Sequence, residues 1–249
     1  MIIQVIGLPG SGKTSLSLEL CNRLNAIHLN ADEIRKDLSK DLGFSKEDRI
    51  KQARRMGALS RLLSKQNQIV VADFVCPTEQ TREVFGQADF IIWVDRIEQS
   101  RYEDTNTIWE KPTKYDVQIK NGKTVDEEVE EVIHRCSLFD WKKPSTLMLG
   151  RYQPWHEGHE ALYNEASKRT EQVLIGVRNT HKTSEKDPLS FNEVKKYITN
   201  FRGNSFVVKM PNITNIVYGR DVGYLIEKVE LGKDIECISA TNKRKEMGL

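Results

Sequence analysis

The sequence predicts an α/β protein of two consecutive units, each built on a parallel sheet. Three observations lead to this prediction. Short apolar runs alternate along the chain with longer stretches of helical periodicity, as expected for strands that helices cover on both faces. A glycine-rich turn at residues 7–12 follows the first apolar run, and a second turn, at residues 150–158, follows a later one. Both turns therefore join a strand to a helix, which is typical of α/β folds.

Four strands and three helices are expected in the first unit. The apolar runs place its strands at residues 2–6, 26–29, 69–72 and 90–94. Helical periodicity places its helices at residues 14–24, 46–66 and 125–136. Ser45, with Asp48 three residues later, is expected to cap the second of these helices. Residues 95–125 lose the pattern and are polar, so we expect a loop or lid there.

The second unit repeats the alternation after a linker at residues 142–145. Ser190 and Glu193 have the spacing of a capping box at the start of one of its helices. We expect its helices at residues 159–168 and 190–200, and its strands at residues 146–149, 172–177, 205–209 and 235–238. The domains are therefore predicted at residues 1–143 and 144–249.

Composition and charge exclude several classes of protein. A formal net charge of +2 gives no basic field of the kind that nucleic-acid-binding proteins present. No apolar run approaches the roughly 20 residues that cross a bilayer, and the N-terminal segment lacks the features of a signal peptide. The four cysteines have no metal-binding spacing, which favours reduced thiols. We therefore expect a cytoplasmic enzyme that binds neither nucleic acid nor membranes.

The first turn has the complete pattern of a P-loop, in which backbone N–H groups converge on phosphate oxygens at the positive end of a helix. Lys13 is expected to reach the β- and γ-phosphates of ATP as a catalytic residue, and Thr14 to bind Mg²⁺. Asp73 follows a predicted buried strand, where it either holds Mg²⁺ through water or caps the next loop. Nucleotide contacts are predicted for Gly7, Pro9, Gly10, Ser11, Gly12, Lys13, Thr14 and Ser15.

Two blocks after the P-loop resemble the adenylylsulfate kinase family, whose members phosphorylate the ribose 3′-hydroxyl of adenylyl sulfate. The blocks are Asn30-Ala31-Asp32-Glu33-Ile34-Arg35 and Asp41-Leu42-Gly43-Phe44-Ser45-Lys46-Glu47-Asp48-Arg49. The resemblance implies that Asp32 is catalytic, because a carboxylate beside the acceptor hydroxyl can orient it and accept its proton. A simple helix-surface pair of Asp32 with Arg35 is the alternative. Acceptor binding is implied for Arg35, Phe44, Arg49 and Gln52.

The chain departs from this family in the lid. The family's Lys-Gly-Leu-Tyr motif is absent, and Arg101-Tyr102-Glu103-Asp104-Thr105-Asn106 stands in its place. Lids decide which acceptor an enzyme encloses. Kinase chemistry is therefore expected, whereas the identity of the acceptor stays open.

The second turn carries two histidines, His156 and His159, at a strand-to-helix junction. Both are expected to be catalytic, because two imidazoles there can hydrogen-bond the α–β bridging region of a nucleoside triphosphate. For such a pair taken alone, a metal site or simple helix capping is the alternative. Further nucleotide contacts are predicted for Gly150, Arg151, Tyr152, Gln153, Pro154, Gly158, Ser239, Ala240, Thr241 and Arg244.

Residues 150–159 and 238–244 together resemble the cytidylyltransferase-like superfamily. This resemblance implies a small Rossmann-like nucleotidyltransferase domain after the P-loop kinase domain. Such a domain transfers CMP from CTP, or AMP from ATP, to a phosphorylated or anionic acceptor and releases pyrophosphate.

The two halves together predict a bifunctional enzyme that uses Mg²⁺, ATP, and CTP or ATP as the nucleotidyl donor. The kinase is expected to phosphorylate a hydroxyl, such as a nucleotide 3′-hydroxyl, on the transferase product. Two alternatives stay open: the kinase makes the acceptor that the transferase activates, or the kinase half only senses nucleotides. The expected partners are small molecules and nucleotides, and a homodimer is compatible with both resemblances.

Overall fold

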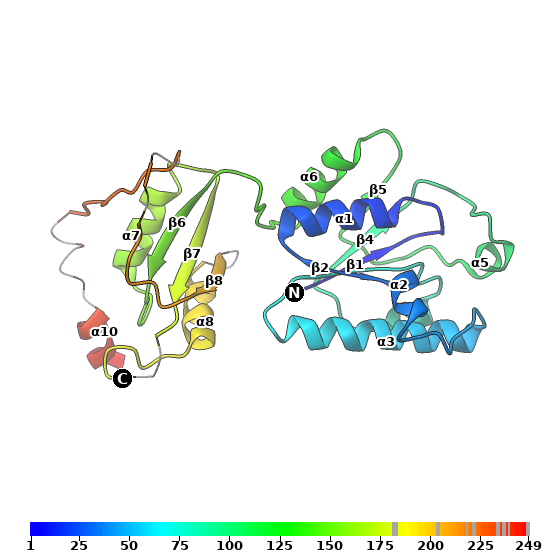
Figure 1. Cartoon of the computed structure of the whole chain (residues 1–249), viewed down its shortest axis with the longest axis horizontal. Helices are drawn as coiled ribbons and strands as arrows, with labels where there is room; N and C mark the ends of the chain where they lie inside the picture. The colour runs from blue at the N-terminus through cyan, green and yellow to red at the C-terminus, as the bar shows by residue number, and fades with distance from the viewer. Residues whose placement is uncertain are drawn as a thin grey trace. The chain divides into compact units, whose positions relative to one another are not determined.

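Two parallel sheets lie at the centres of two compact units, Met1–Lys142 and Lys143–Leu249 (Figure 1). Each unit is described by itself below. The structure is a computed structural model, and the residues that it describes are 1–180, 184–202, 205–217, 219–220, 223–232, 235, 238 and 240–247.

The first unit is built on a five-stranded parallel sheet with the strand order β2-β3-β1-β4-β5. Strand β1 lies in the middle of this sheet although it is the first element of the chain. All five of its residues are buried, which explains its continuous apolar run. The strands are β1 (Ile2–Ile6), β2 (Ile27–Asn30), β3 (Val70–Asp73), β4 (Phe90–Val94) and β5 (Val117–Ile119).

Helices cover both faces of the first sheet (Figure 1). On one face, Leu16, Leu20 and Leu24 of α1 are fully buried against the strands and α6, because their spacing of four places them on one side of the helix. On the other face, Met56 of α3 and Phe85 of α4 are fully buried. The helices are α1 (Lys13–Leu24), α2 (Ala31–Lys36), α3 (Lys46–Ser64), α4 (Glu79–Phe85), α5 (Glu103–Ile108) and α6 (Val125–Arg135).

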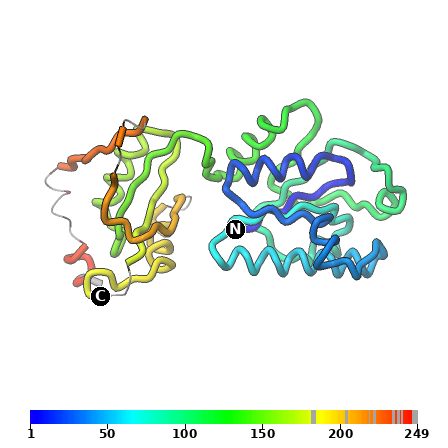
Figure 2. The backbone as a smooth tube through the Cα atoms, viewed as in Figure 1, coloured from blue at the N-terminus to red at the C-terminus, as the bar shows by residue number. Residues whose placement is uncertain are grey.

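The loop or lid that was expected at residues 95–125 contains two regular elements, α5 and β5. Strand β5 pairs with β4, and its two end residues, Val117 and Ile119, are buried. A strand of three residues with a polar residue at its centre gives no apolar run, so periodicity cannot detect it. Figure 2 shows this segment as a long excursion from the sheet between β4 and β5.

The chain that follows α6 returns to the first unit and contacts α1. Arg23, in the last turn of α1, pairs with the buried carboxylate of Asp140 and lies 2.6 Å from the Glu130 carboxylate of α6. The backbone N–H of Trp141 donates to the Arg23 carbonyl at 2.7 Å. These contacts fasten the last residues of the unit to its first helix.

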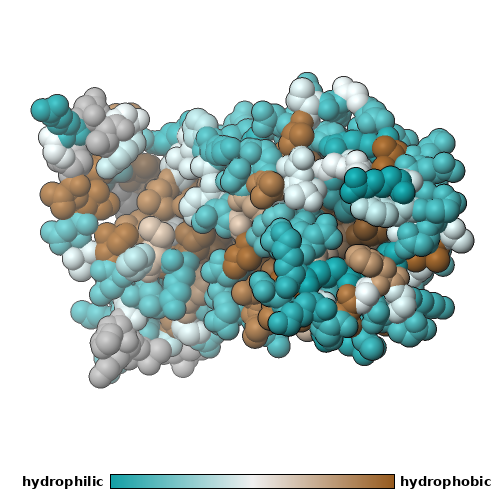
Figure 3. All heavy atoms as spheres, turned by 45° about the vertical axis from the view of Figure 1, so that its right-hand side comes forward, coloured by the Kyte–Doolittle hydropathy of each residue, from teal (hydrophilic) through white to brown (hydrophobic). Residues whose placement is uncertain are grey.

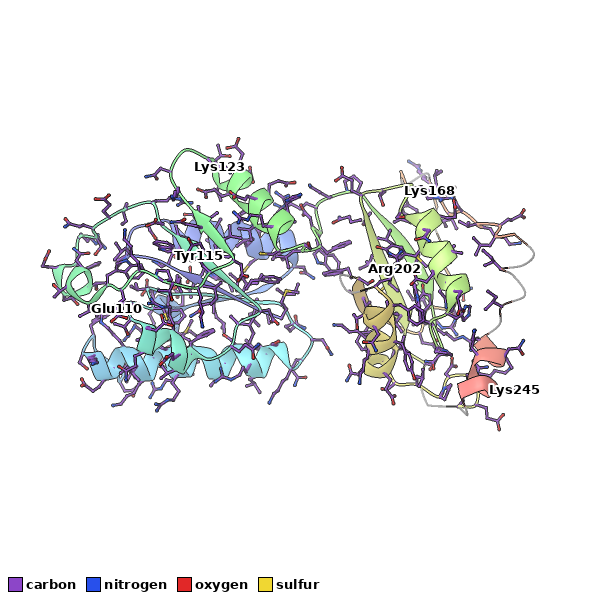
Figure 4. All side chains as sticks on the ribbon, turned by 180° about the vertical axis from the view of Figure 1, so that it is seen from behind. Glu110, Tyr115, Lys123, Lys168, Arg202 and Lys245 are labelled. Atoms are coloured by element: carbon purple, nitrogen blue, oxygen red, sulfur yellow. The ribbon has the colours of Figure 1, made fainter. Side chains whose placement is uncertain are left out.

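The second unit has a three-stranded parallel sheet with the order β6-β7-β8. Ile175 of β7 and Ile198 of α8 are fully buried in its core. Arg202, labelled in Figure 4, follows α8; its Nε donates to Glu160 of α7 at 2.7 Å, and its guanidinium lies over the Tyr163 ring. The elements are β6 (Ser145–Gly150), α7 (Glu157–Ala166), β7 (Gln172–Arg178), α8 (Phe191–Phe201), β8 (Phe206–Met210) and α10 (Ala240–Met247).

The strand predicted at residues 235–238 lies partly outside the described residues, because residues 236 and 237 are not among them. Ile235 and Ile238 are described, and the N–H of Ile238 donates to the Ile235 carbonyl at 3.0 Å.

Among the described residues, no helix is long and apolar enough to cross a membrane. Hydrophilic residues cover much of the face drawn in Figure 3, and apolar residues form scattered patches on it.

Candidate active sites

One cavity of about 910 Å³ lies at the carboxyl ends of β1, β2 and β3 in the first unit. Because these strands are parallel, the residues that follow them meet at one edge of the sheet. The cavity brings together most of the predicted kinase residues: Pro9, Gly10, Gly12, Lys13, Thr14, Ser15, Asp32, Arg35, Phe44, Arg49, Gln52 and Asp73.

The P-loop forms one wall of this cavity. Gly10 and Gly12 have φ values of 84° and 91°, a left-handed conformation that glycine adopts without strain. Gly12 is also the N-cap of α1 and provides no side-chain cap, so the first N–H groups of the helix remain available for a phosphate. Gly7 and Ser11 are buried behind this wall. A Cβ at Gly7 would lie 2.5 Å from the Val94 carbonyl oxygen, so only glycine fits there.

Lys13 is the buried cation of the P-loop. Its Nζ donates to the Leu8 carbonyl at 2.8 Å, which folds the side chain back along the loop. Burial lowers the pKa of Lys13 to about 8, and the nearby carboxylates of Asp73 and Asp32 oppose this shift. The lysine, the P-loop and two carboxylates therefore share one small region of the cavity.

Asn30 connects the residues predicted to bind Mg²⁺. Its side-chain amide donates to Asp73 Oδ1 at 2.6 Å and to the Thr14 hydroxyl at 3.3 Å. Nε2 of His28 lies 3.3 Å from Asp73 Oδ2 but at an angle that makes no hydrogen bond. The second carboxylate oxygen of Asp73 is thus buried without a hydrogen-bond partner among the described residues.

These residues fit a magnesium ion. Mg²⁺ prefers oxygen ligands and is usually held by one or two carboxylates together with substrate phosphates and water. Thr14 provides a hydroxyl, and Asp73 provides a buried carboxylate oxygen that has no hydrogen-bond partner in the described chain. Within those residues there is no group of three or more His, Cys, Asp or Glu that could hold a metal without a substrate.

Another wall of the cavity holds an aromatic ring close to two guanidinium groups. The guanidinium carbons of Arg35 and Arg49 lie 4.7 Å and 5.6 Å from the centre of the Phe44 ring, which is 65% exposed. Arg35 donates to the backbone carbonyl of Gly43 at 2.8 Å. Burial, and next the charge of Arg49, lower the pKa of Arg35. An exposed ring close to two cations suits a planar base that carries an anionic group.

Asp32 lies in the first turn of α2, between these two walls. The Asn30 side chain caps this helix by accepting from the N–H groups of Asp32 and Glu33, at 2.9 Å and 3.1 Å. Gln52 is buried below Asp32 and donates to the Ala31 carbonyl at 3.4 Å. The cap therefore fixes the backbone that presents the Asp32 carboxylate to the cavity.

Sequence patterns did not reveal the contacts that Arg96 makes with the P-loop. Arg96, which follows β4, donates to the Ser11 carbonyl at 2.9 Å and pairs with Glu128 of α6, which is 1% exposed. A Cβ at Gly12 would lie 1.9 Å from Arg96 Nη1. An arginine after a strand has no distinctive sequence signal, and its acidic partner lies 32 residues away.

The family comparison decides the identity of this unit. The model of a family described as adenylylsulphate kinase matches residues 1–131, just over half of the chain. The chain belongs to this family. The matched region ends before the second unit begins.

Curated relatives of this chain include adenylylsulfate kinases. A probable adenylyl-sulfate kinase of Pseudomonas aeruginosa is 31% identical over 184 residues, covering 62% of this chain and 86% of the relative. An adenylyl-sulfate kinase of Picosynechococcus sp. (strain ATCC 27264 / PCC 7002 / PR-6) is 41% identical over 92 residues, covering 34% of this chain and 52% of the relative. This chain thus spans most of the first relative and about half of the second.

A bifunctional relative and a solved structure extend the comparison. The bifunctional enzyme NodQ of Rhizobium meliloti (strain 1021) is 31% identical over 121 residues, covering 44% of this chain and 19% of the relative. The structure of the Mycobacterium tuberculosis APS kinase CysC with AMPPNP and APS has a TM-score of 0.51 and 22% identity, covering 55% of this chain and 96% of that one. That structure shares the fold of the adenylylsulfate kinase unit.

The two predicted histidines of the second unit lie together at the start of α7. Their rings stack with centroids 3.8 Å apart. His156 Nδ1 accepts from the Gly158 N–H at 3.2 Å, and His159 Nδ1 accepts from the His156 N–H at 3.3 Å. The pair therefore forms a reciprocal helix cap, which is the alternative considered for it above.

The same hydrogen bonds assign the tautomer of both rings. Burial lowers the pKa of His156, and burial together with His156 lowers the pKa of His159 to about 3. Both imidazoles are therefore neutral at neutral pH. A neutral imidazole whose Nδ1 accepts a hydrogen bond carries its proton on Nε2, so each ring offers one Nε2–H donor.

Other predicted residues of the second unit surround this pair. Nη1 of Arg244, in α10, donates to the Gln153 carbonyl at 2.8 Å, and its Nη2 donates to the Thr241 hydroxyl at 3.1 Å. A Cβ at Gly150 would lie 2.7 Å from the Tyr152 ring, which contacts His159 edge to face. The structure also describes Arg151, which pairs with Asp187, and Pro154 and Ala240, whereas Ser239 lies outside the described residues.

Proposed function

We propose that the first unit is an ATP-dependent kinase that phosphorylates a hydroxyl of an anionic nucleotide, with adenylyl sulfate as the first candidate. The observation that carries this proposal is the shared cavity. Its P-loop wall suits the triphosphate of ATP, and the ring of Phe44, close to two arginines, suits the base and anionic group of an acceptor.

Each residue has a defined role in the proposed transfer. The first N–H groups of α1 and the Lys13 ammonium bind the phosphates and stabilise charge on the transferred group. Thr14 and Asp73 would hold Mg²⁺, which neutralises charge on the β- and γ-phosphates when it is bound. Asp32 orients the acceptor hydroxyl and accepts its proton as the oxygen attacks the γ-phosphorus, while the bond from that phosphorus to the β–γ bridging oxygen breaks and ADP leaves. Arg35 and Arg49 hold the acceptor, so the hydroxyl is positioned for an in-line attack.

A product assay by mass spectrometry tests this proposal. The protein with ATP and Mg²⁺ receives adenylyl sulfate in one reaction and a CDP-linked compound in another. Asp32→Asn is compared with Glu33→Gln, which neutralises the next residue while leaving the cavity lining intact. We expect Asp32→Asn to lower kcat on the order of 100-fold or more, with ATP binding unchanged, and Glu33→Gln to retain activity. Turnover of neither compound in the wild type would reject a nucleotide hydroxyl as the acceptor and favour an upstream or sensing role.

A second function, nucleotidyl transfer, is proposed for the second unit. The tautomers of His156 and His159 support it, because two neutral rings offer two Nε2–H donors at the positive end of α7. Such donors stabilise the negative charge that develops at the α-phosphate while pyrophosphate leaves. Arg244 and Thr241, close to this helix start through Gln153, would bind the departing phosphates. Transfer of CMP or AMP to a phosphorylated or anionic acceptor would then either make the substrate of the kinase or use the product of the kinase as its acceptor.

Pyrophosphorolysis of candidate products tests the second function in the reverse direction. Labelled pyrophosphate is incubated with the protein, a panel of candidate CMP- or AMP-linked products and Mg²⁺, and formation of labelled CTP or ATP is measured. Replacing His159 with Asn should abolish label incorporation, and replacing the exposed His134 of α6 with Asn should not. Exchange that persists in His159→Asn would reject the proposed site.

A further inference from the structure

The acceptor-side arginine Arg49 already holds a carboxylate of its own chain. Its Nη2 donates to Asp104 Oδ2 at 2.7 Å and to the Thr105 hydroxyl at 3.1 Å. Both partners belong to α5 and line the cavity. They lie in the segment that replaces the family's lid motif, so this contact belongs to the part of the chain where acceptor selection is expected.

The two partners of this ion pair are held very differently. The Arg49 side chain is 10% exposed, and its Nε donates to the Phe44 carbonyl at 2.9 Å. The Asp104 side chain is 61% exposed and lies on a helix of only six residues. The arginine is therefore positioned by its surroundings, whereas the carboxylate can leave at little cost, because its side chain is exposed to solvent that screens its charge.

Asp104 occupies the place of an anion at Arg49, inside the cavity that the acceptor would enter. Arg35 and Arg49 both lie close to the Phe44 ring, and the charge of Arg49 acts on Arg35, so an anion bound at Arg49 relieves the repulsion between the two arginines. An anionic acceptor that uses Arg49 must displace Asp104, whereas a neutral acceptor leaves the pair intact. An acceptor therefore binds to Arg49 only if its anionic group interacts with the arginine more strongly than the Asp104 carboxylate does.

We propose that Asp104 is a specificity-determining residue, an internal competitor that an anionic acceptor displaces from Arg49. This inference rests on the proposed kinase function of the first unit. It predicts that Asp104 weakens the binding of every acceptor whose anionic group reaches Arg49 and leaves ATP binding unaffected.

The test compares Asp104→Asn with Glu103→Gln. Glu103 is the preceding residue of the same helix and does not line the cavity, so its substitution removes one negative charge without touching Arg49. Binding of adenylyl sulfate, adenosine and ATP is measured by calorimetry, and KM and kcat are measured with adenylyl sulfate. We expect Asp104→Asn to tighten adenylyl sulfate binding about threefold to fivefold, corresponding to about 1 kcal/mol or less. Adenosine and ATP should bind as in the wild type, and the difference should shrink at high salt.

Two results would overturn the inference. Weaker adenylyl sulfate binding by Asp104→Asn would mean that the carboxylate supports the acceptor site instead of competing in it. Equal affinities of Asp104→Asn and Glu103→Gln would mean that the pair has no role in selection.

The binding and turnover measurements separate this inference from the proposed function. Tighter binding by Asp104→Asn without phosphoryl transfer would retain the competitor and reject adenylyl sulfate as the kinase substrate. Turnover without an effect of Asp104→Asn would retain the kinase and reject the competitor. Failure of all three proteins to bind adenylyl sulfate would reject both.

Discussion

Asn30 donates a hydrogen bond to Asp73 at 2.6 Å, across the paired ends of strands β2 and β3. The same side chain caps α2, the helix that carries Asp32. One amide therefore connects the proposed metal ligand to the proposed base, through its NH₂ group on one side and its oxygen on the other.

Substitutions of Asn30 should separate its contact with Asp73 from its role as the cap of α2. Asn30→Ala removes the cap and the donor, and we expect it to lower the free energy of unfolding by about 1–2 kcal/mol. Asn30→Asp retains a good cap but places a second carboxylate against Asp73, so its stability should recover when Mg²⁺ is added. Thermal unfolding with and without Mg²⁺ checks both. Equal responses of the two variants to Mg²⁺ would contradict a metal site at Asp73.

The pKa of Lys13 predicts how nucleotide affinity depends on pH. Burial lowers this pKa to about 8 in the free protein, so the ammonium loses its proton as pH rises through about 8. Only the charged form attracts the triphosphate, and affinity for ATP should therefore fall above that pH. Lys13→Arg keeps its charge at all these pH values and should give a flat profile, even if its affinity is lower overall. ATP titrations followed by calorimetry from about pH 7 to 10 measure the difference. A flat wild-type profile would show that Lys13 stays charged.

Glu128 should be required for both stability and nucleotide binding. Glu128→Gln leaves the Arg96 guanidinium without its buried counter-charge, a change that costs on the order of 3 kcal/mol. Arg96 then holds the Ser11 carbonyl less firmly, and the dissociation constant for ATP should rise about fivefold. Glu131→Gln is the matched control, because Glu131 lies on the same helix in a surface pair with Lys123. Urea unfolding and ATP titration should show little change in that control, and similar losses in both variants would refute the role of Glu128.

The pKa of His159 predicts acid sensitivity of the second unit. Burial lowers this pKa from 6.5 to about 3, so below about pH 6.5 the unfolded chain binds a proton that the folded unit does not. The contribution to stability is fully present above that pH and is lost as pH falls towards 3. Between about pH 8 and pH 5 the wild type should lose about 2 kcal/mol more than His159→Asn, whose amide can still accept the capping hydrogen bond. Urea unfolding at the two pH values provides the test, and parallel losses in the two proteins would contradict it.

The sequence predicted the elements whose signal is local. Strands β1 and β4 have the expected bounds, and the caps at Ser45 and Ser190 are confirmed by hydrogen bonds to Asp48 and Glu193. Periodicity and capping spacing are properties of neighbouring residues, so one chain is enough to see them. Strand β5 was missed because three residues provide too little pattern.

Contacts between distant residues could not be predicted in the same way. His28 has no acidic partner close to it in the sequence before β2, yet it lies 3.3 Å from Asp73 because β2 pairs with β3. The pairing of these strands is a tertiary choice that no local pattern records. Arg96 and Asp104 were missed as partners of the P-loop and of Arg49 for the same reason. The motifs therefore predicted which residues line the cavity. The pairing of the strands decides which other residues contact those residues, and that pairing could not be predicted from the motifs.

The position of Glu128 has a consequence for dividing the gene into separately expressed pieces. All the side chains proposed to touch the kinase substrates lie before residue 106, so a fragment ending there would carry every motif of the kinase unit. Such a fragment would lack α6, and with it the counter-charge behind the P-loop and the apolar side chains that cover α1. The contacts of Arg23 with Asp140 and Trp141 extend this requirement to the end of the first unit. The shortest fragment of the first unit that is expected to fold alone therefore ends at Lys142, some 35 residues beyond the last motif of the kinase unit.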